Sequence, residues 1–359
     1  MTQKRIEIPH HQDDYECMWN GIEDLYIRDT GERLPPSFFF VLSGFGSFCY
    51  LKTEKAEQKR MVALGDGRTK KMYEFLAPIV GFEYRHYEYR TFEKALSKAK
   101  SQIDSGFPCV LGALDMYYLP YYKKLYHGGH IPFHYVLMVG YDDDRQCIYV
   151  HDCGCESVQE LPYDELRPAW DCSYPGLSKP NTVCIVRMNS AKNKYEIARE
   201  ALAAKGELFL NPPAGVLGIR GFEMFVKELP DWKSRLTKED YDNLLRHMIT
   251  FFGTVPTVPN ALLGIQEPDS VAFGGGFDKA GLVLHMLGRE YNDEAMTEAA
   301  GEIGRGAAVT EEIKDIVVDY LTGKNDNTDE LPGHFAQVCR IMESGFRILG
   351  YGNKAGLRE

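Results

Sequence analysis

The sequence predicts an α+β fold followed by a helical domain, and three observations support this prediction. Up to about residue 190, stretches with helical spacing of apolar residues alternate with apolar runs typical of strands. From residue 191 onward, strand signals fade and long helical patterns dominate. A length of 359 residues favours two domains over one. We therefore divide the chain into an α+β domain, residues 1–190, and a helical domain, residues 191–359.

The elements of the first domain follow from apolar spacing and from turn residues. Helices are predicted at residues 17–26 and 89–103, and strands at residues 107–119, 134–141, 146–152 and 182–188. A charged turn of three aspartates and an arginine, residues 142–145, separates two of these strands. This arrangement predicts a β-hairpin.

Six helices are predicted in the second domain, and Pro- and Gly-rich loops separate them. They cover residues 191–209, 220–229, 238–252, 277–292, 309–322 and 333–349. The glycine run 273-FGGGF-277 precedes one of these helices. Because no strand precedes it and no Gly-Lys-Ser/Thr ending follows, we interpret it as a flexible turn and not as a phosphate-binding loop.

Charge and composition exclude several classes of protein. The chain has 41 Lys+Arg against 52 Asp+Glu, a formal net charge of −11, so its field repels nucleic acid. The first residues lack the apolar stretch of a signal peptide, and the most apolar run, residues 38–50, is too short to span a bilayer. We expect a cytoplasmic, soluble protein with no membrane partner, whose nine cysteines are mostly free thiols.

The predicted hairpin places a histidine near an aspartate. If the turn is centred on Asp143, His134 and Asp152 lie directly opposite each other on one face, with Cβ atoms about 5 Å apart. A carboxylate in that position accepts a hydrogen bond from the imidazole and stabilises its protonated form. As alternatives, His134 is a core histidine with satisfied hydrogen bonds, and Asp152 simply ends its strand.

A His-Asp pair of this kind needs a nucleophile, and Cys17 at the start of a predicted helix is the candidate. Asp13 and Asp14 precede the helix as candidate caps. A thiol at a helix N-terminus feels the positive end of the helix dipole, and a nearby imidazolium favours the thiolate further. The three residues together are suited to acyl transfer through a thioester intermediate. The alternative is that Cys17 is a small buried hydrophobic residue.

The order of these residues resembles the papain-like fold in its bacteriocin-leader-peptidase version, in which a Cys opens an early helix and His and Asp follow on adjacent strands. The run 134-HYVLMVGYDDDRQCIYVHDCG-154, continuing to 158-VQELPYDEL-166, is similar to the His-to-Asp block of that family. The segment 105-SGFPCVLGALDMYYLPYY-122 and the helical half with 273-FGGGFDKAGLVLHMLG-288 resemble the butirosin-biosynthesis acyltransferase family. In overall character the chain also resembles the amide-forming enzyme of closthioamide biosynthesis.

The resemblance implies a thioester-dependent acyltransferase that forms an amide between a carrier-bound acyl chain and an amine or diamine in specialised-metabolite biosynthesis. It assigns Cys17 as nucleophile, His134 as general base and acid, and Asp152 as the residue that orients the imidazole. The usual oxyanion-hole Gln lies six residues before the nucleophile, where this chain has His11, with Gln12 beside it. Both side chains are therefore candidate oxyanion donors.

Hydrolysis and amide formation use the same three residues, so a cysteine peptidase or amidohydrolase of the same fold remains an alternative. The outcome depends on whether water or a positioned amine intercepts the acyl-enzyme. The aromatic segments 38-FFF-40 and 117-YYLPYY-122 are candidates for a dry pocket, and core packing is the alternative for both. Asp115 is a candidate to bind the ammonium group of an amine substrate, unless it accepts backbone hydrogen bonds in a turn, and Tyr118 is a second candidate substrate-binding residue.

No cofactor and no metal is expected, and the resemblance implies an acyl donor carried on the phosphopantetheine arm of a partner carrier protein. Carrier proteins are acidic, and one basic segment is a candidate surface to dock one. It comprises Lys52, Lys55, Lys59, Arg60, Arg68, Lys70 and Lys71. A solvated surface explains these charges equally well.

Two other classes of protein remain as competing interpretations. A structural zinc site would draw on the thiol-rich region around Cys153 and Cys155, but a single Cys-x-Cys without a second paired motif is a poor zinc signature. The other candidates for such a site are Cys147, Cys172 and His151. A non-catalytic binding protein is distinguished by slow alkylation of Cys17 near neutral pH.

Overall fold

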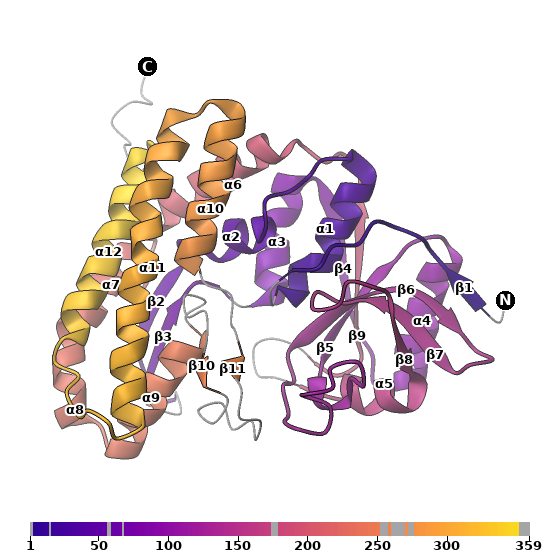
Figure 1. Cartoon of the computed structure of the whole chain (residues 1–359), viewed down its shortest axis with the longest axis horizontal. Coiled ribbons are helices and arrows are strands. Elements are labelled where there is room, and N and C mark those ends of the chain that lie inside the picture. The colour runs from indigo at the N-terminus through magenta and orange to yellow at the C-terminus, as the bar shows by residue number, and fades with distance from the viewer. Residues whose placement is uncertain are drawn as a thin grey trace. The chain divides into compact units, whose positions relative to one another are not determined.

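A computed structural model describes most of the chain as a mixture of helices and antiparallel sheets (Figure 1). The described residues are 3–13, 16–55, 59–66, 68–173, 179–251, 258–259, 270–271 and 276–351. The coarse α+β prediction is confirmed. Among the described residues, no helix combines the length and the apolar character needed to cross a bilayer.

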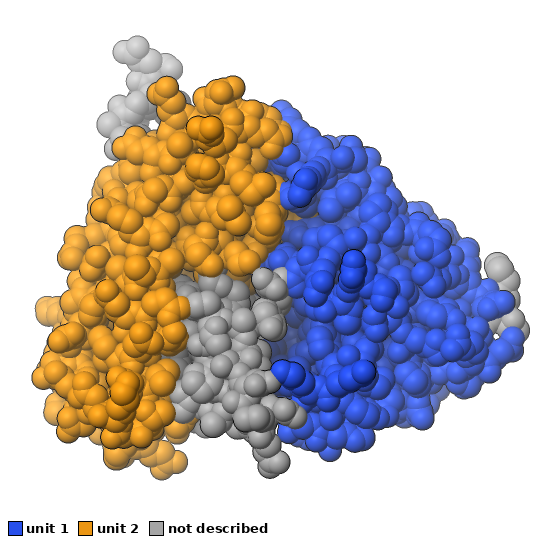
Figure 2. All heavy atoms as spheres, viewed as in Figure 1, with its two compact units in different colours: residues 1–34, 68–197, 259–271 blue, residues 35–67, 198–258, 272–359 orange. Residues whose placement is uncertain are grey.

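The chain divides into two compact units that differ from the predicted domains (Figure 2). Unit 1 comprises residues 1–34, 68–197 and 259–271, and unit 2 comprises residues 35–67, 198–258 and 272–359. The difference from a single boundary near residue 190 has a local cause within unit 2. There, an early hairpin joins the later chain through the hydrogen bond from the Tyr50 N–H to the Val216 carbonyl, 2.8 Å.

Unit 1 is built around a seven-stranded antiparallel sheet in the order β4-β9-β5-β6-β7-β8, with β1 also pairing with β6. Its strands are β1 (Gln3–Arg5), β4 (Phe82–Glu88), β5 (Cys109–Leu114), β6 (His134–Asp142), β7 (Cys147–His151), β8 (Gln159–Pro162) and β9 (Thr182–Met188). Its helices are α1 (Cys17–Thr30), α3 (Thr69–Val80), α4 (Phe92–Asp104) and α5 (Tyr163–Trp170), with a 3-10 turn at Met116–Tyr118.

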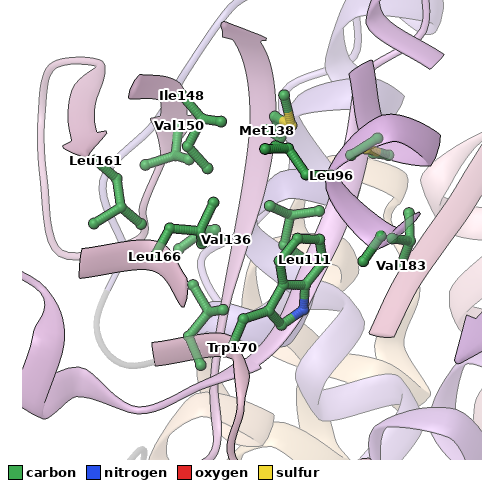
Figure 3. Packing of buried hydrophobic residues seen from close by; sticks show 14 of the residues in the cluster. Leu96, Leu111, Val136, Met138, Ile148, Val150, Leu161, Leu166, Trp170 and Val183 are labelled. Carbon is green, nitrogen blue, oxygen red and sulfur yellow. The ribbon is translucent and has the colours of Figure 1, made fainter. Parts of the chain in front are cut away.

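One face of this sheet carries a hydrophobic core (Figure 3). Val136 and Met138 of β6 pack there with Val150 of β7, and α4 and α5 contribute Leu96 and Trp170. All of these side chains are buried. Because side chains alternate along a strand, the residues between them, such as Leu137, point to the opposite face.

Helix α1 packs so closely against that opposite face that position 21 has no space for a side chain larger than that of glycine. A Cβ on Gly21 would lie 2.5 Å from the Cβ of Leu137. The helix begins at Cys17 and its N-cap is Glu16, which makes no side-chain capping hydrogen bond. The prediction that Asp13 caps the helix is therefore wrong, because the first turn starts four residues later. Asp14 lies outside the described residues.

Unit 2 is mostly helical and contains the hairpin of β2 (Phe48–Lys52) and β3 (Arg60–Leu64). Its core is aromatic: the ring of Phe48 stacks on Phe222, with centroids 4.0 Å apart, and Tyr50 and Phe225 lie beside it. Its helices are α2 (Phe38–Gly44), α7 (Gly218–Glu228), α8 (Trp232–Arg235), α9 (Lys238–Phe251), α10 (Gly276–Tyr291), α11 (Glu294–Leu321) and α12 (Leu331–Ile348). Helix α6 (Lys194–Leu210) begins in unit 1 and continues into unit 2, and β10 (Val258–Pro259) pairs with β11 (Ser270–Val271).

Most predicted elements are confirmed, but one predicted strand is too long and one predicted helix starts too late. The strand at residues 182–188 has the predicted bounds, whereas the run 107–119 is a strand only to Leu114 and then forms the 3-10 turn. Helix α11 begins at Glu294 and not at residue 309. The run 38-FFF-40 forms part of α2, where Phe38 and Phe39 are fully buried, so core packing explains these two rings. The glycines of 273-FGGGF-277 before Gly276 lie outside the described residues.

Candidate active site

The structure brings Cys17, His134 and Asp152 together within unit 1. The Nε2 atom of His134 lies 2.8 Å from Oδ2 of Asp152, and both side chains are buried. Cys17 is hydrogen-bonded to His134 and also lies 4.0 Å from the Phe133 carbonyl oxygen. Because Nε2 of His134 faces Asp152, Nδ1 is the nitrogen available to the thiol. The three residues thus form a chain from sulfur through imidazole to carboxylate.

The hairpin that carries His134 and Asp152 has a different register from the predicted one. Its turn occupies residues 143–146, so Tyr141 pairs with Ile148, and farther from the turn Leu137 pairs with His151. His134 and Asp152 are therefore diagonal neighbours and not direct partners. Long side chains on one face still meet across such a diagonal, which explains why the predicted contact forms in a different register.

A β-bulge puts the two side chains on the same face. The pairing shifts between Met138 and Gly140, so β6 contains one residue more than β7 across this interval. Without the extra residue, the alternation of side chains would place His134 and Asp152 on opposite faces of the sheet. Gly140 is also required here, because a Cβ on it would lie 2.6 Å from the Lys4 carbonyl oxygen of β1.

Asp152 is held by two tyrosines that were not predicted as its partners. Tyr121 donates to Oδ2 at 2.9 Å and Tyr122 donates to Oδ1 at 2.5 Å. Burial opposes the charged carboxylate, but the charge of His134 and the hydrogen bonds from His134 and the tyrosines keep the pKa of Asp152 below its ordinary value. The tyrosine-rich segment 117–122 was considered only as a candidate for a dry pocket or for core packing, and its closeness to His134 in sequence was the only signal of this contact.

The protonation of His134 follows from its neighbours. Burial by itself lowers the pKa of His134, but the charges of Asp152 and Cys17 and hydrogen bonds to both raise it to about 10. The imidazole is therefore positively charged near neutral pH. A positive ring beside a thiol favours the thiolate, which is the nucleophilic form.

Seven of the eight other cysteines are in an environment that disfavours the thiolate. All nine lie in the described part of the chain as free thiols. Burial raises the pKa of seven of them: Cys109, Cys147, Cys153, Cys155, Cys172, Cys184 and Cys339. Even Cys153, next to Asp152, is thereby kept as a neutral thiol. Cys184 is close to His86, 3.7 Å from Nδ1, but its pKa is raised to about 12.

The two candidate oxyanion donors lie near α1 in different environments. Both ring nitrogens of His11 face carboxylates, with Nδ1 2.8 Å from Asp24 and Nε2 3.1 Å from Glu23. The His11 ring therefore has no N–H left for a substrate oxygen. Gln12 is exposed and donates to the Gly154 carbonyl at 3.2 Å. An oxyanion role for either side chain stays a prediction.

Asp115 adopts the turn arrangement that was the alternative to ammonium binding. Its Oδ1 accepts from the backbone N–H groups of Tyr117, 3.1 Å, and Ile131, 2.9 Å, and its Oδ2 lies 2.6 Å from Nδ1 of His130. These contacts satisfy the carboxylate within the loop. Tyr118 is half-buried and its ring lies edge-on to that of Tyr117. Substrate contacts of both residues stay predictions.

Within the described residues, three groups of side chains have the spacing of metal ligands. They are His10 with Asp24 and His151, His134 with Asp152 and Cys153, and His11 with Asp13 and Glu23. Cys147, Cys155 and Cys172 belong to none of them, so the thiol-rich zinc site considered from the sequence does not assemble in this part of the chain. His151 faces Asp24 instead, a contact that the sequence analysis missed.

The basic segment is divided between the two units. Lys52, Lys55 and Lys59 are exposed in unit 2, whereas Arg68, Lys70 and Lys71 are exposed in unit 1. The Arg60 side chain is buried, because β3 directs it into the interior of unit 2, and so Arg60 is removed from the candidate docking surface.

Comparison with known families locates a similarity in the region of this site. Residues 16–153 match the family model described as butirosin biosynthesis protein H, N-terminal. The match covers less than half of the chain and includes Cys17, His134 and Asp152. No curated protein matches the chain.

Proposed function

We propose that this protein is a thioester-dependent acyltransferase of papain-like fold that forms an amide through an acyl-enzyme on Cys17. The observation that carries the proposal is the chain of contacts from Cys17 through His134 to Asp152. The match of residues 16–153 to a biosynthetic family supports it, because that family is named for the biosynthesis of an antibiotic. The acyl donor is a thioester on the phosphopantetheine arm of a carrier protein, and the acceptor is an amine or diamine.

In the first step, the Cys17 thiolate attacks the carbonyl carbon of the donor thioester. The carbon–sulfur bond to the phosphopantetheine arm breaks, and the departing thiolate takes the proton of the His134 imidazolium. The acyl group then rests on Cys17 as a thioester. Asp152 holds the imidazole so that one nitrogen faces the sulfur, and its negative charge favours the protonated ring before the step.

In the second step, the amine attacks the acyl-enzyme carbonyl and His134 takes a proton from the amine nitrogen. The bond from the acyl carbon to Cys17 breaks, which restores the thiolate and releases the amide. The neutral imidazole formed in the first step is therefore the base of the second. Water in place of the amine would give hydrolysis, so the amine must be bound where water is excluded.

Intact-protein mass spectrometry tests both steps. Incubation with acylated carrier protein should add the mass of the acyl group to the wild-type chain, and an amine should remove it and release the amide. Cys17→Ala should show neither the adduct nor the product, while Cys49→Ala, a substitution at a cysteine of unit 2, should behave like wild type. Wild-type turnover by Cys17→Ala would refute the proposal, and loss of the acyl group to water in the presence of amines would indicate a hydrolase.

The exposed lysines suit an acidic carrier protein, and the two units are tested separately. Lys70→Glu in unit 1, and in a second variant Lys59→Glu in unit 2, should slow acyl transfer from the carrier-bound donor while sparing a small thioester donor. Lys94→Glu, at an exposed position of α4, is the matched charge change. Equal effects on the two donors, or an equal effect of Lys94→Glu, would refute docking at these lysines.

A further inference from the structure

A second buried cluster of ionisable groups lies next to the proposed active site, and Asp24 is its centre. The Asp24 side chain is fully buried. Its Oδ2 lies 2.7 Å from Nδ1 of His10 and 2.8 Å from Nδ1 of His151. Its Oδ1 lies 2.8 Å from Nδ1 of His11 and accepts from the His11 backbone N–H at 3.2 Å. One carboxylate therefore gathers three histidines.

The contacts require two of these rings to carry a positive charge. The second nitrogen of His10 faces the Cys155 carbonyl at 2.8 Å, and the second nitrogen of His11 faces Glu23 at 3.1 Å. A nitrogen that faces an acceptor must carry a proton, so both rings are imidazolium. Burial lowers both pKa values, but the hydrogen bonds to carboxylates raise that of His10 above its ordinary range and that of His11 to about 10. Two positive rings then balance Asp24 and Glu23.

A metal ion fits this cluster less well than protons do. Two imidazoles bound to one zinc ion through Zn–N bonds of about 2.0–2.1 Å splay apart around a tetrahedral centre. The rings of His10 and His151 instead lie close together, with centroids 4.1 Å apart and an angle of 35° between their planes. The distances of 2.7 and 2.8 Å from their Nδ1 atoms to Asp24 are those of charge-assisted hydrogen bonds.

The cluster connects the two elements that supply Cys17 and Asp152. Asp24 lies seven residues after Cys17, two turns along the same side of α1. His151 directly precedes Asp152, and since neighbouring strand residues point to opposite faces, His151 faces α1 while Asp152 faces His134. The end of β7 is thus held from both sides.

We propose that Asp24 is a positioning residue: by binding His151 it fixes the end of β7 to α1, and so holds Asp152 and His134 in register with Cys17. This inference rests on the proposed function of Cys17. Asp24 touches none of the reacting atoms, and its effect passes through the backbone from His151 to Asp152. Loss of the hydrogen bond between Asp24 and His151 should loosen the contact between Asp152 and His134. The protonated form of His134 is then less favoured, which reduces the thiolate fraction of Cys17.

The test measures, as a function of pH, the rate at which iodoacetamide alkylates Cys17. The reaction is run well below the unfolding temperature and is followed by mass spectrometry of the Cys17 peptide. Asp24→Asn should move the midpoint of the profile up by about one pH unit, which corresponds to about tenfold less thiolate below the midpoint. The ionisable groups that interact with Cys17 include His134, Cys153, Tyr73 and Tyr135, and this variant replaces none of them.

A second pair of variants tests the same contact from the strand. His151→Leu removes the donor to Asp24 and should shift the profile as Asp24→Asn does. His151→Asn retains an N–H at the place of Nδ1 and should restore the wild-type profile. Tyr26→Phe is the matched control on α1, because it removes partly buried hydrogen bonds to Glu32 and to the Lys192 carbonyl without touching the cluster. It should lower the unfolding temperature and leave the profile unchanged.

An unchanged profile in both Asp24→Asn and His151→Leu would overturn the proposal, as would an equal shift in Tyr26→Phe, which would indicate general loosening. One equivalent of a divalent metal in the purified chain, removed with loss of fold by a chelator, would also overturn it. The alkylation assay uses no acyl donor. If the wild-type protein forms no acyl-enzyme but the variants still shift the alkylation profile, the proposed function is refuted and the positioning role stands.

Discussion

Tyr122 offers a sharp test of how the buried Asp152 is stabilised. The change Tyr122→Phe removes one hydroxyl group and keeps the ring, which packs edge-on against His134 with centroids 5.6 Å apart. The lost hydrogen bond is 2.5 Å long and ends on a carboxylate that is 1% exposed. Because water cannot reach that oxygen, we expect the free energy of unfolding to fall by about 1.5–3 kcal/mol, the range for a hydrogen bond to a charged group.

A tyrosine–aspartate pair at the surface is the control for this prediction. Tyr163 donates to Asp143 at 2.8 Å, but the Asp143 side chain is 35% exposed. In Tyr163→Phe, water replaces the lost donor, so the free energy of unfolding should fall by about 1 kcal/mol or less. Urea unfolding followed by circular dichroism measures both variants. Equal losses in the two would refute the claim that burial of Asp152 determines the cost.

Tyr122→Phe should leave the positive charge of the His134 ring intact. With one donor fewer, Asp152 keeps its negative charge close to the imidazole, so alkylation of Cys17 near neutral pH should stay within about twofold of wild type. Acid unfolding should begin at a higher pH. A carboxylate with a lowered pKa gives stability that is present above its unfolded value and is lost as pH falls through the folded value. Tyr122→Phe raises that folded value.

Three further outcomes are expected. Gly21→Ala should lower the free energy of unfolding in urea by about 1–3 kcal/mol, because its Cβ would lie 2.5 Å from the Cβ of Leu137. Gly301→Ala, at an exposed position of α11 with no neighbour within 4 Å, should raise it by about 0.5–1 kcal/mol, and the opposite order would contradict the packing. Thermal stability should fall as pH rises from about 6.5 towards 10, because His11 and His134 have pKa values raised to about 10. A histidine whose pKa is raised on folding contributes stability that is complete below its pKa in the unfolded state and is lost as pH rises through its pKa in the folded state. His11→Gln should remove part of this alkaline decline, and an alkaline decline equal to that of wild type would contradict the assignment to His11.

The sequence was informative about unit 1 where local periodicity and packing agree. Strand β9 and the hairpin of β6 and β7 alternate or run apolar between clear turn residues, so their positions were predictable. The hairpin of β2 and β3 was missed, because it is stabilised by aromatic contacts to a helix some 170 residues later in the chain, such as that of Phe48 with Phe222. Local patterns contain no information about such a distant partner, and the same contacts place this hairpin in unit 2.

The cluster around Asp24 shows a different limit of sequence reasoning. An aspartate inside an amphipathic helix normally points to solvent, and Asp24 is buried together with three histidines that come from two separate segments of the chain. Two of them, His10 and His11, lie before the helix, and the third, His151, is the last residue of β7. Of the two adjacent histidines, only His11 was considered, as a candidate oxyanion donor, because the shared partner Asp24 is apparent only once the strand and the helix are packed together.

The contact between His134 and Asp152 was predicted from a register that is wrong by two residues, and the reason it still forms lies in the parity of the strand. Counting from the real turn alone places Asp152 opposite Leu137, on the wrong face for His134. The bulge between Met138 and Gly140 adds one residue and reverses the parity, which brings Asp152 back to the face of His134. Gly140 permits the close approach of β1 at this point. The geometry of the proposed active site therefore depends on an irregularity in β6 that no residue of the site itself encodes.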